Sequence, residues 1–173
     1  IEDIQGGGTI ARAELKGIID ELPPLVIVGK DSNGLYHVVK TAKVTAAVAA
    51  AATAVQVAKG HLFKVGEAIT VGGALKGASD LIAAIDKSNA SYDTITVAGA
   101  IGAAAIGDVL ILANVKAAAN AAKFKYVPEA ITMNKVDVTV ANQQSGLLVR
   151  GTVNESVMPY PIDKDLKATL GFI

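Results

Sequence analysis

The sequence predicts a mainly β protein, a β-rich α+β fold, and three observations support that prediction. Short apolar runs rich in β-branched residues recur along the chain, and several alternate with polar residues. Glycine, aspartate and asparagine separate these runs at intervals of about 10 residues, which is typical of antiparallel strands joined by turns. Clear helical spacing is confined to Ile10–Leu22. We therefore expect a small antiparallel β core with an N-terminal helix.

The N-terminal segment, residues 1–22, is expected to form an arm followed by that helix. Residues Ile1–Thr9 are polar and glycine-rich, which predicts a flexible arm. The next apolar residues fall at i, i+3, i+4 and i+7, the spacing of one helix face: Leu15, Ile18, Ile19 and Leu22. Pro23–Pro24 ends the helix. This apolar face could pack on the sheet or dock a partner, and packing is the preferred interpretation.

A β-hairpin is the strongest local prediction. Leu25–Val28 and Leu35–Val39 are apolar and β-branched, and Asp31–Gly34 lies between them. Asparagine and glycine adopt the positive φ angles that a tight reversal needs. The two runs are therefore expected to pair as antiparallel strands.

Residues 44–113 are expected to form an inserted module, a small β-barrel or roll. The expected strands are short and separated by polar turns or glycines: Val55–Val57, Leu62–Val65, Ala68–Val71, Leu81–Ile85, Thr94–Val97 and Val109–Leu112. Gly72–Gly73 breaks the pattern between two of them. Ala46–Ala54 and Ala100–Ala105 stay ambiguous, because alanine favours helix while the neighbouring residues favour strand.

The remaining residues, 23–43 with 114–173, are expected to form the β core that carries the insertion. Lys116–Lys123 could be a short helix or a connector. Val136–Val140 and Leu147–Val153 alternate between apolar and polar residues, so both predict half-buried strands. Pro159 and Pro161 keep the following segment extended, and a last helical turn is expected at Lys164–Leu170, before Phe172–Ile173.

Composition limits the possible partners. Sixteen basic and sixteen acidic residues cancel, so no global field attracts nucleic acid or acidic lipid. The longest uncharged run, Val44–Ala58, is too short and too interrupted by polar residues to cross a membrane. The N-terminus lacks the basic start and apolar stretch of a signal peptide. The apolar residues are mostly alanine and valine, which bury little area each, so we expect a partner copy to supply further burial.

The search for chemistry predicts no catalytic, cofactor-binding or metal-binding residues. There is no Cys, and His37 and His61 lie outside any metal-binding spacing, so both are expected to be partly exposed strand or turn residues. Gly29–Lys30 lacks the rest of a phosphate-binding loop and is expected in a turn, like Gly72–Gly73. Four aspartates recur beside expected turns, where capping is preferred over calcium binding: Asp80, Asp86, Asp93 and Asp108.

The segments outside the insertion resemble head decoration proteins of tailed phages, of the lambda protein D type, and the related head fiber proteins of phages that infect gut Bacteroidetes. The resemblance rests on Pro24–Val28, the Asp31–Gly34 turn, Leu35–Val39, Val136–Val140 and Gly146–Ser156, followed by Pro159, Pro161 and Leu166–Ile173. Lys59–Glu67 and Gly107–Asp108 are similar to the small β module found in several phage structural proteins.

The resemblance implies a prophage-encoded structural protein on the capsid exterior of a virion, made in the bacterial cytoplasm. Its partners would be the phage major capsid protein and two further copies of itself, as a homotrimer that braces neighbouring capsomers. The arm, Ile1–Thr9, would engage the shell, although the helix after it departs from the short arm of the lambda type. The inserted module would project outward, toward host surface or glycans.

Two other classes stay open at this point. A stand-alone carbohydrate-binding or adhesion module would also be β-rich, but it usually presents an exposed aromatic platform, and the sequence has four Tyr and no Trp. An enzyme would need carboxylates that the fold brings together. Neither is preferred over the structural protein.

Overall fold

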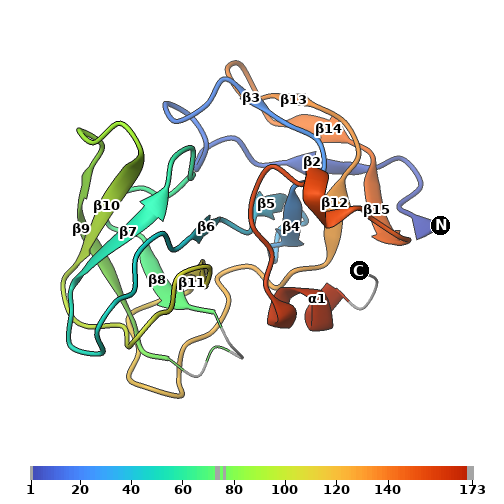
Figure 1. The fold of residues 1–173 in the computed structure, drawn as a ribbon. Coiled ribbons are helices and arrows are strands. Elements are labelled where there is room, and N and C mark those ends of the chain that lie inside the picture. The colour runs from blue at the N-terminus through green and yellow to red at the C-terminus, as the bar shows by residue number, and fades with distance from the viewer. Residues whose placement is uncertain (1, 73–74, 76, 171–173) are drawn as a thin grey trace. The chain divides into compact units, whose positions relative to one another are not determined.

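The computed structural model describes residues 2–72, 75 and 77–170 of the protein (Figure 1). Strands account for 37% of the structure and helices for 6%, which confirms the expected β-rich fold. Three parts of the sequence predictions lie outside the described residues: Ile1 of the arm, Gly73 of the Gly72–Gly73 break, and the closing Phe172–Ile173.

The protein divides into two compact units. Unit 1 consists of Ile1–Val39 and Tyr126–Ile173, and unit 2 consists of Lys40–Lys125. The expected insertion, 44–113, lies inside unit 2, which also includes 40–43 and 114–125. Residues 1–22 belong to unit 1 and supply strands to it.

Unit 1 is built on a seven-stranded sheet and a two-stranded one. The large sheet has the order β1-β15-β12-β4-β5-β2-β14, and every pairing in it is antiparallel except β2 with β5. Its strands are β1 (Glu2–Asp3), β2 (Gly8–Ile10), β4 (Ile27–Lys30), β5 (Tyr36–Val38), β12 (Ala130–Thr132), β14 (Gln143–Ser145) and β15 (Leu147–Arg150). The small sheet pairs β3 (Glu21–Leu22) with β13 (Val136–Asp137).

The N-terminal residues are part of this sheet, so the expected flexible arm is wrong. Residues 2–10 run antiparallel to residues 143–150, as β1 with β15 and β2 with β14. Since β14 and β15 follow each other in the sequence, the sheet closes on itself. A Cβ on Gly7 would lie 2.3 Å from the carbonyl oxygen of Ser145. The glycines that suggested flexibility therefore allow the close approach of two backbones.

The expected helix at Ile10–Leu22 is also wrong. Ile10 lies in β2, and Glu21–Leu22 forms β3. Between them, residues 13–18 form turns that include Gly17, whose φ of +80° is left-handed and interrupts a right-handed helix. Leu15 and Leu22 are nevertheless buried, at 1% and 0% exposure. Their helical spacing therefore reflects burial from two separate elements, a turn and a strand.

The expected hairpin is confirmed. β4 pairs with β5 antiparallel, with Val28 opposite Val38. The Asp31 carboxylate accepts the backbone N–H groups of Asn33 and Leu35, both at 2.9 Å. Gly34 has a φ of +87°, which supplies the reversal that the sequence predicted.

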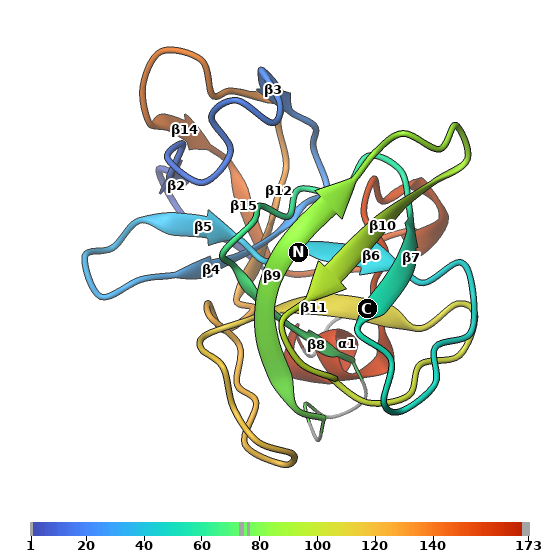
Figure 2. The same cartoon turned by 90° about the vertical axis from the view of Figure 1, so that its left-hand side faces the viewer.

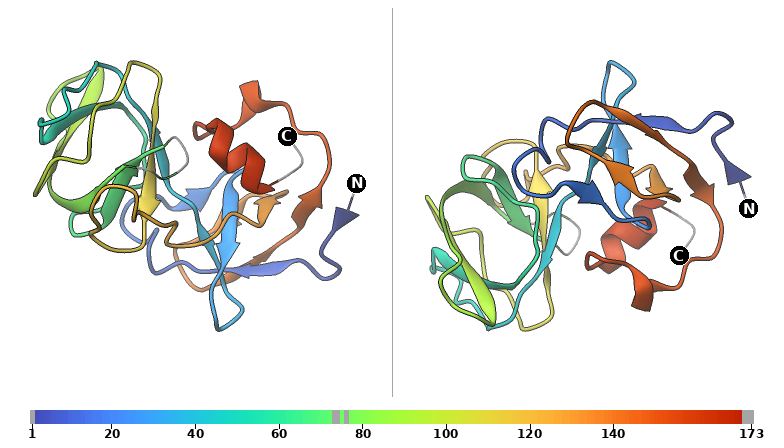
Figure 3. Two further views of the ribbon diagram at one scale, coloured as in Figure 1. Left: turned by 90° about the horizontal axis from the view of Figure 1, so that it is seen from below. Right: turned by 90° about the horizontal axis from the view of Figure 1, so that it is seen from above.

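Unit 2 is a closed antiparallel barrel, in agreement with the expected barrel or roll. The expected strand Leu62–Val65 is wrong, because these residues lie in the connection between β7 and β8. The six strands of the barrel have the order β6-β11-β8-β9-β10-β7. They are β6 (Thr41–Lys43), β7 (Ala54–Ala58), β8 (Ala68–Val71), β9 (Ser79–Asp86), β10 (Tyr92–Val97) and β11 (Val109–Ala113). A bridge between Val44 and Val57 joins the ends of the series. Figures 2 and 3 show these strands curving around one interior, which buried aliphatic side chains such as Val55, Ile95 and Ile111 fill.

The alanine-rich runs are not helical. Val48 and Ala104, one from each run, exchange backbone hydrogen bonds of 2.8 and 3.1 Å as an isolated bridge. Lys116–Lys123, expected as a short helix or a connector, is a connector. Its Ala117 bridges to Ser79 of β9, so the segment returns along the barrel.

The C-terminal segment matches the predictions in part. The expected strand Val136–Val140 is shorter than predicted, because only β13 pairs and Val140 is 74% exposed. The expected strand Leu147–Val153 ends at Arg150, as β15. A 3₁₀ turn, η1 (Glu155–Val157), follows. The expected helical turn is confirmed as α1 (Lys164–Leu170).

Candidate functional site

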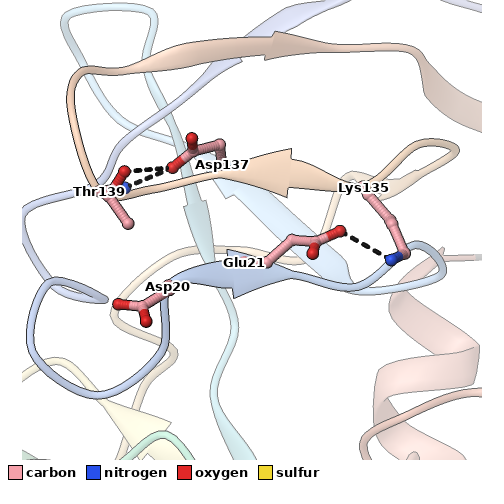
Figure 4. A pocket seen from close by; sticks show the side chains of 5 residues that line it. All are labelled: Asp20, Glu21, Lys135, Asp137 and Thr139. Carbon is pink, nitrogen blue, oxygen red and sulfur yellow. Dashed lines mark hydrogen bonds and ion pairs between the residues drawn. The ribbon is translucent and has the colours of Figure 1, made fainter.

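The β3–β13 sheet of unit 1 borders an acidic depression of about 420 Å³ (Figure 4). It is lined by Asp20, Glu21, Lys135, Asp137 and Thr139. The pairing of Glu21 with Asp137 brings these residues together from segments more than 100 residues apart. The sequence analysis assigned these residues to an expected helix and the polar face of an expected strand, and it named none of them as a site, because no local pattern links the two segments.

Several side chains of this depression form ion pairs or hydrogen bonds with one another. Lys135 Nζ lies 2.8 Å from Glu21 Oε1, and Asp137 accepts the backbone N–H and the hydroxyl of Thr139 at 2.8 and 2.6 Å. The side-chain hydrogen bond from Thr139 is the largest cause that keeps the pKa of Asp137 below its ordinary value. A carboxylate stabilised in its charged form is a poor proton acceptor at neutral pH. Asp137 is therefore poorly suited to act as a base.

A second polar cluster in unit 1 surrounds His37, a residue of β5. Its Nδ1 lies 3.3 Å from Glu14 Oε2, and its Nε2 lies 3.4 Å from Asp31 Oδ2. The Tyr126 ring stacks on the imidazole, and the Tyr126 hydroxyl donates to Glu14 Oε1 at 2.5 Å. These contacts tie the Glu14 turn, the hairpin and the start of the C-terminal segment together. Each ring nitrogen of His37 faces a carboxylate, so we interpret the cluster as a structural contact between these segments.

The other histidine, His61, lies in the barrel of unit 2. Its side chain is 1% exposed, so the expected partly exposed residue is wrong. Its Nδ1 accepts the Phe63 backbone N–H at 3.2 Å, which places the proton of the neutral ring on Nε2. Nε2 faces Asp93 Oδ2 at 3.4 Å without making a full hydrogen bond. Lys59 Nζ holds the other Asp93 oxygen at 2.6 Å.

The pKa of His61 is lowered from its ordinary value. Burial of the ring is the largest cause, and the nearby charge of Asp93 opposes it. The positive charges of Lys87, Lys40 and Lys59 add to the lowering. The ring is therefore held neutral inside the barrel.

The four aspartates named from the sequence have separate roles. Asp86 and Asp108 accept turn N–H groups from Ser88 and Ala105, at 2.9 and 2.8 Å, as expected of turn residues. Asp80 and Asp93 lie in strands and are buried, so the turn interpretation is wrong for them. Asp80 pairs with Lys116 Nζ at 2.8 Å, just as Asp93 pairs with a lysine. The two buried aspartates, Asp80 and Asp93, therefore each form an ion pair with a lysine of unit 2.

The remaining sequence candidate, Gly29–Lys30, also differs from the expectation. Gly29 lies within β4, not in a turn, and a Cβ there would meet the Val127 carbonyl oxygen at 2.3 Å. The residue is glycine because a neighbouring backbone passes against the strand. Gly72 follows β8 directly, at the expected break.

Unit 2 has a groove of its own, of about 340 Å³, beside the segment that follows β11. Leu81 and Val115 line it, at 41% and 59% exposure. Lys116 and Lys125 line it as well. The groove combines apolar surface with basic side chains, and none of its residues was named as a site by the sequence analysis.

The fold and these clusters define the class as a predominantly β protein of two units, in which polar side chains mainly brace strands and turns. No family model matches the sequence, and no curated protein or solved structure matches it significantly. Among the described residues, no helix has the length and apolar character needed to span a bilayer.

Proposed function

We propose that this protein is a non-enzymatic structural protein of a tailed-phage virion, a capsid decoration or head fiber protein. It would bind and stabilise the capsid exterior through the phage major capsid protein, as a homotrimer, without nucleic acid or membrane. The source of the proposal is the resemblance to such proteins of segments on both sides of the insertion: Pro24–Val28, Asp31–Gly34, Leu35–Val39, Val136–Val140 and Gly146–Ser156.

One structural observation supports the proposal above the others. The two segments that carry the resemblance lie on either side of unit 2 in the sequence, yet both belong to unit 1. There β4 and β15 both pair with β12, so the segments share one sheet. A decoration-type core with an outward inserted module requires this connectivity. A protein of two consecutive domains would keep the segments apart.

The aromatic residues favour a structural role over the alternative, a stand-alone carbohydrate-binding or adhesion module. Tyr36 is buried at 4% exposure, and Tyr126 is stacked on His37. Tyr92 and Tyr160 are partly covered as well. A glycan platform needs an exposed aromatic face, and the four tyrosines do not provide one.

The paired N-terminus changes how docking would occur. An arm that adds a strand to the shell must have free backbone N–H and C=O groups, and residues 2–10 already pair with 143–150. Docking by strand addition would therefore require these residues to leave unit 1. Hydrogen exchange of the free and particle-bound protein would reveal that release as lost protection in residues 143–150.

The decisive experiment is quantitative mass spectrometry of phage particles purified from the source bacterium after prophage induction. We expect peptides such as residues 151–164 at copy numbers near those of the shell protein. Intact particles without these peptides would refute the virion role. High-resolution imaging should then show trimers on the capsid, and single copies would contradict the homotrimer.

The isolated protein tests the alternative function, a carbohydrate-binding or adhesion module. Glycan-array binding by the isolated protein, together with its absence from particles, would support the adhesion module. A lack of glycan binding combined with presence on particles would leave the capsid role as the better explanation.

A further inference from the structure

The hairpin turn between β4 and β5 presents an asparagine followed directly by a glycine. Asn33 and Gly34 are both exposed. Gly34 has a φ of +87°, and the atom nearest to a Cβ built there is Cε of Lys30, at 3.8 Å. Gly34 therefore has no side chain beside its backbone nitrogen, and the space where a side chain would stand is open.

We propose that Asn33 is a site of spontaneous deamidation through a cyclic imide. The backbone nitrogen of Gly34 loses its proton to solvent and attacks Cγ, the amide carbon of the Asn33 side chain. A new bond forms between that nitrogen and Cγ, the bond from Cγ to Nδ2 breaks, and the NH₂ group takes a proton from solvent and leaves as ammonia. Water then opens the five-membered imide at either carbonyl, which yields aspartate or isoaspartate. No oxidation or reduction occurs, and water is the sole co-reactant.

The turn's own hydrogen bonds show what the reaction must break. The Gly34 N–H donates to the Asp31 carbonyl oxygen at 3.2 Å, while the flanking bond from the Asp31 N–H to the Leu35 carbonyl oxygen is 2.8 Å. The attacking nitrogen is thus held by the longer of these two bonds. The Asn33 amide nitrogen donates to Asp31 Oδ2 at 3.3 Å, also a long contact. A small opening at the tip frees both reacting groups, and the β4–β5 pairing can stay in place.

Deamidation of Asn33 would change the turn that connects β4 and β5 of unit 1. Either product adds a negative charge beside Asp31, which already faces His37. Isoaspartate also routes the backbone through an extra carbon, which lengthens a turn whose register is set by two Asp31 hydrogen bonds. Deamidation would therefore loosen the hairpin and create charge variants as the protein ages.

The sequence provides its own matched control. Asn89 is also exposed, lies between the paired strands β9 and β10, and accepts the backbone N–H two residues later, at 2.8 Å. Its successor is Ala90, whose methyl group hinders the attack by the backbone nitrogen. Among the seven asparagines of the sequence, Asn33 alone precedes glycine.

The test is incubation of the full folded protein at mildly alkaline pH, followed by peptide mapping that separates aspartate from isoaspartate. We expect Asn33 to convert severalfold faster than Asn89, into both products, and the Asn33→Gln variant to lose the new charge variants. Circular dichroism checks that the protein stays folded, and a denatured sample proves that the conditions allow conversion. The proposal is overturned if Asn33 stays intact in the folded protein while it converts in the denatured sample, or if both asparagines convert at equal rates.

Discussion

The imidazole of His37 stacks on the phenol ring of Tyr126, with ring centroids 4.1 Å apart and planes inclined by 10°. This contact joins β5 to the first residue of the returning C-terminal segment, 89 positions later by the difference of the two residue numbers. It is therefore one of the places where the two separated parts of unit 1 hold together, and it can be tested by substitution.

We expect Tyr126→Phe to destabilise unit 1 by about 1 kcal/mol, because it removes the hydroxyl hydrogen bond to Glu14 and keeps the ring stack. Tyr126→Ala should cost more, since an aromatic pair adds about 0.5–1.5 kcal/mol beyond its buried area. Urea unfolding of both variants measures the difference. Equal losses for the two variants would mean that the stack contributes nothing.

Glycine at position 29 is expected to be essential for steric reasons. Gly29→Ala would place a methyl group 2.3 Å from the Val127 carbonyl oxygen, and overpacking of this kind typically costs about 1–3 kcal/mol. Gly146→Ala is the matched control in the same sheet region, because its nearest neighbour would be 3.5 Å away. Thermal unfolding should show a clear loss for the first variant and little change for the second; the reverse order would contradict the close backbone contact.

Two isoleucines of unit 2 differ in burial, so a comparison of their substitutions tests which of them belongs to the core. Ile111 is 0% exposed in β11, and Ile106 is 69% exposed in the preceding turn. We expect Ile111→Ala to lower the free energy of unfolding by about 2–5 kcal/mol and Ile106→Ala by less than about 0.5 kcal/mol. Chemical denaturation measures both. A similar loss from both variants would show that Ile106 is also covered in solution, for example by a partner copy.

Acid should weaken unit 2 through His61. The ordinary pKa of histidine is 6.5, and burial lowers the pKa of His61 in the folded state. The unfolded protein therefore binds a proton first as the pH falls below 6.5, so the free energy of unfolding decreases with falling pH. The decrease stops once the pH reaches the lower, folded-state pKa. His61→Gln should flatten this part of the stability curve.

The carboxylates act in a separate, more acidic window. Hydrogen bonds lower the pKa of Asp86 and Asp137, and the hydrogen bond to Lys116 lowers that of Asp80, from an ordinary value of 3.8. Their stabilising contribution is present above that value and is lost as the pH falls further. Unfolding measured across both windows distinguishes the two causes. A wild-type curve that is flat just below pH 6.5 would contradict the buried neutral His61.

The sequence by itself determined the features that depend on neighbouring residues. The Asp31–Gly34 turn formed as predicted because one carboxylate accepts two nearby N–H groups and a glycine supplies the positive φ. α1 formed because the Asp163 carboxylate accepts the Leu166 N–H at the helix start. Short apolar runs and polar turns likewise predicted a small antiparallel barrel, in which β7 and β10 bury alternate residues.

Only the tertiary structure decided the features that join distant segments. The glycine-rich N-terminus became a paired strand because residues 143–150 lie beside it, and the apolar spacing of Leu15 and Leu22 was satisfied by burial without a helix. The acidic depression exists because Glu21 pairs with Asp137. Local sequence sets turns and strand faces through short-range sterics and hydrogen bonds, whereas the partner of each strand is chosen by burial of the whole core.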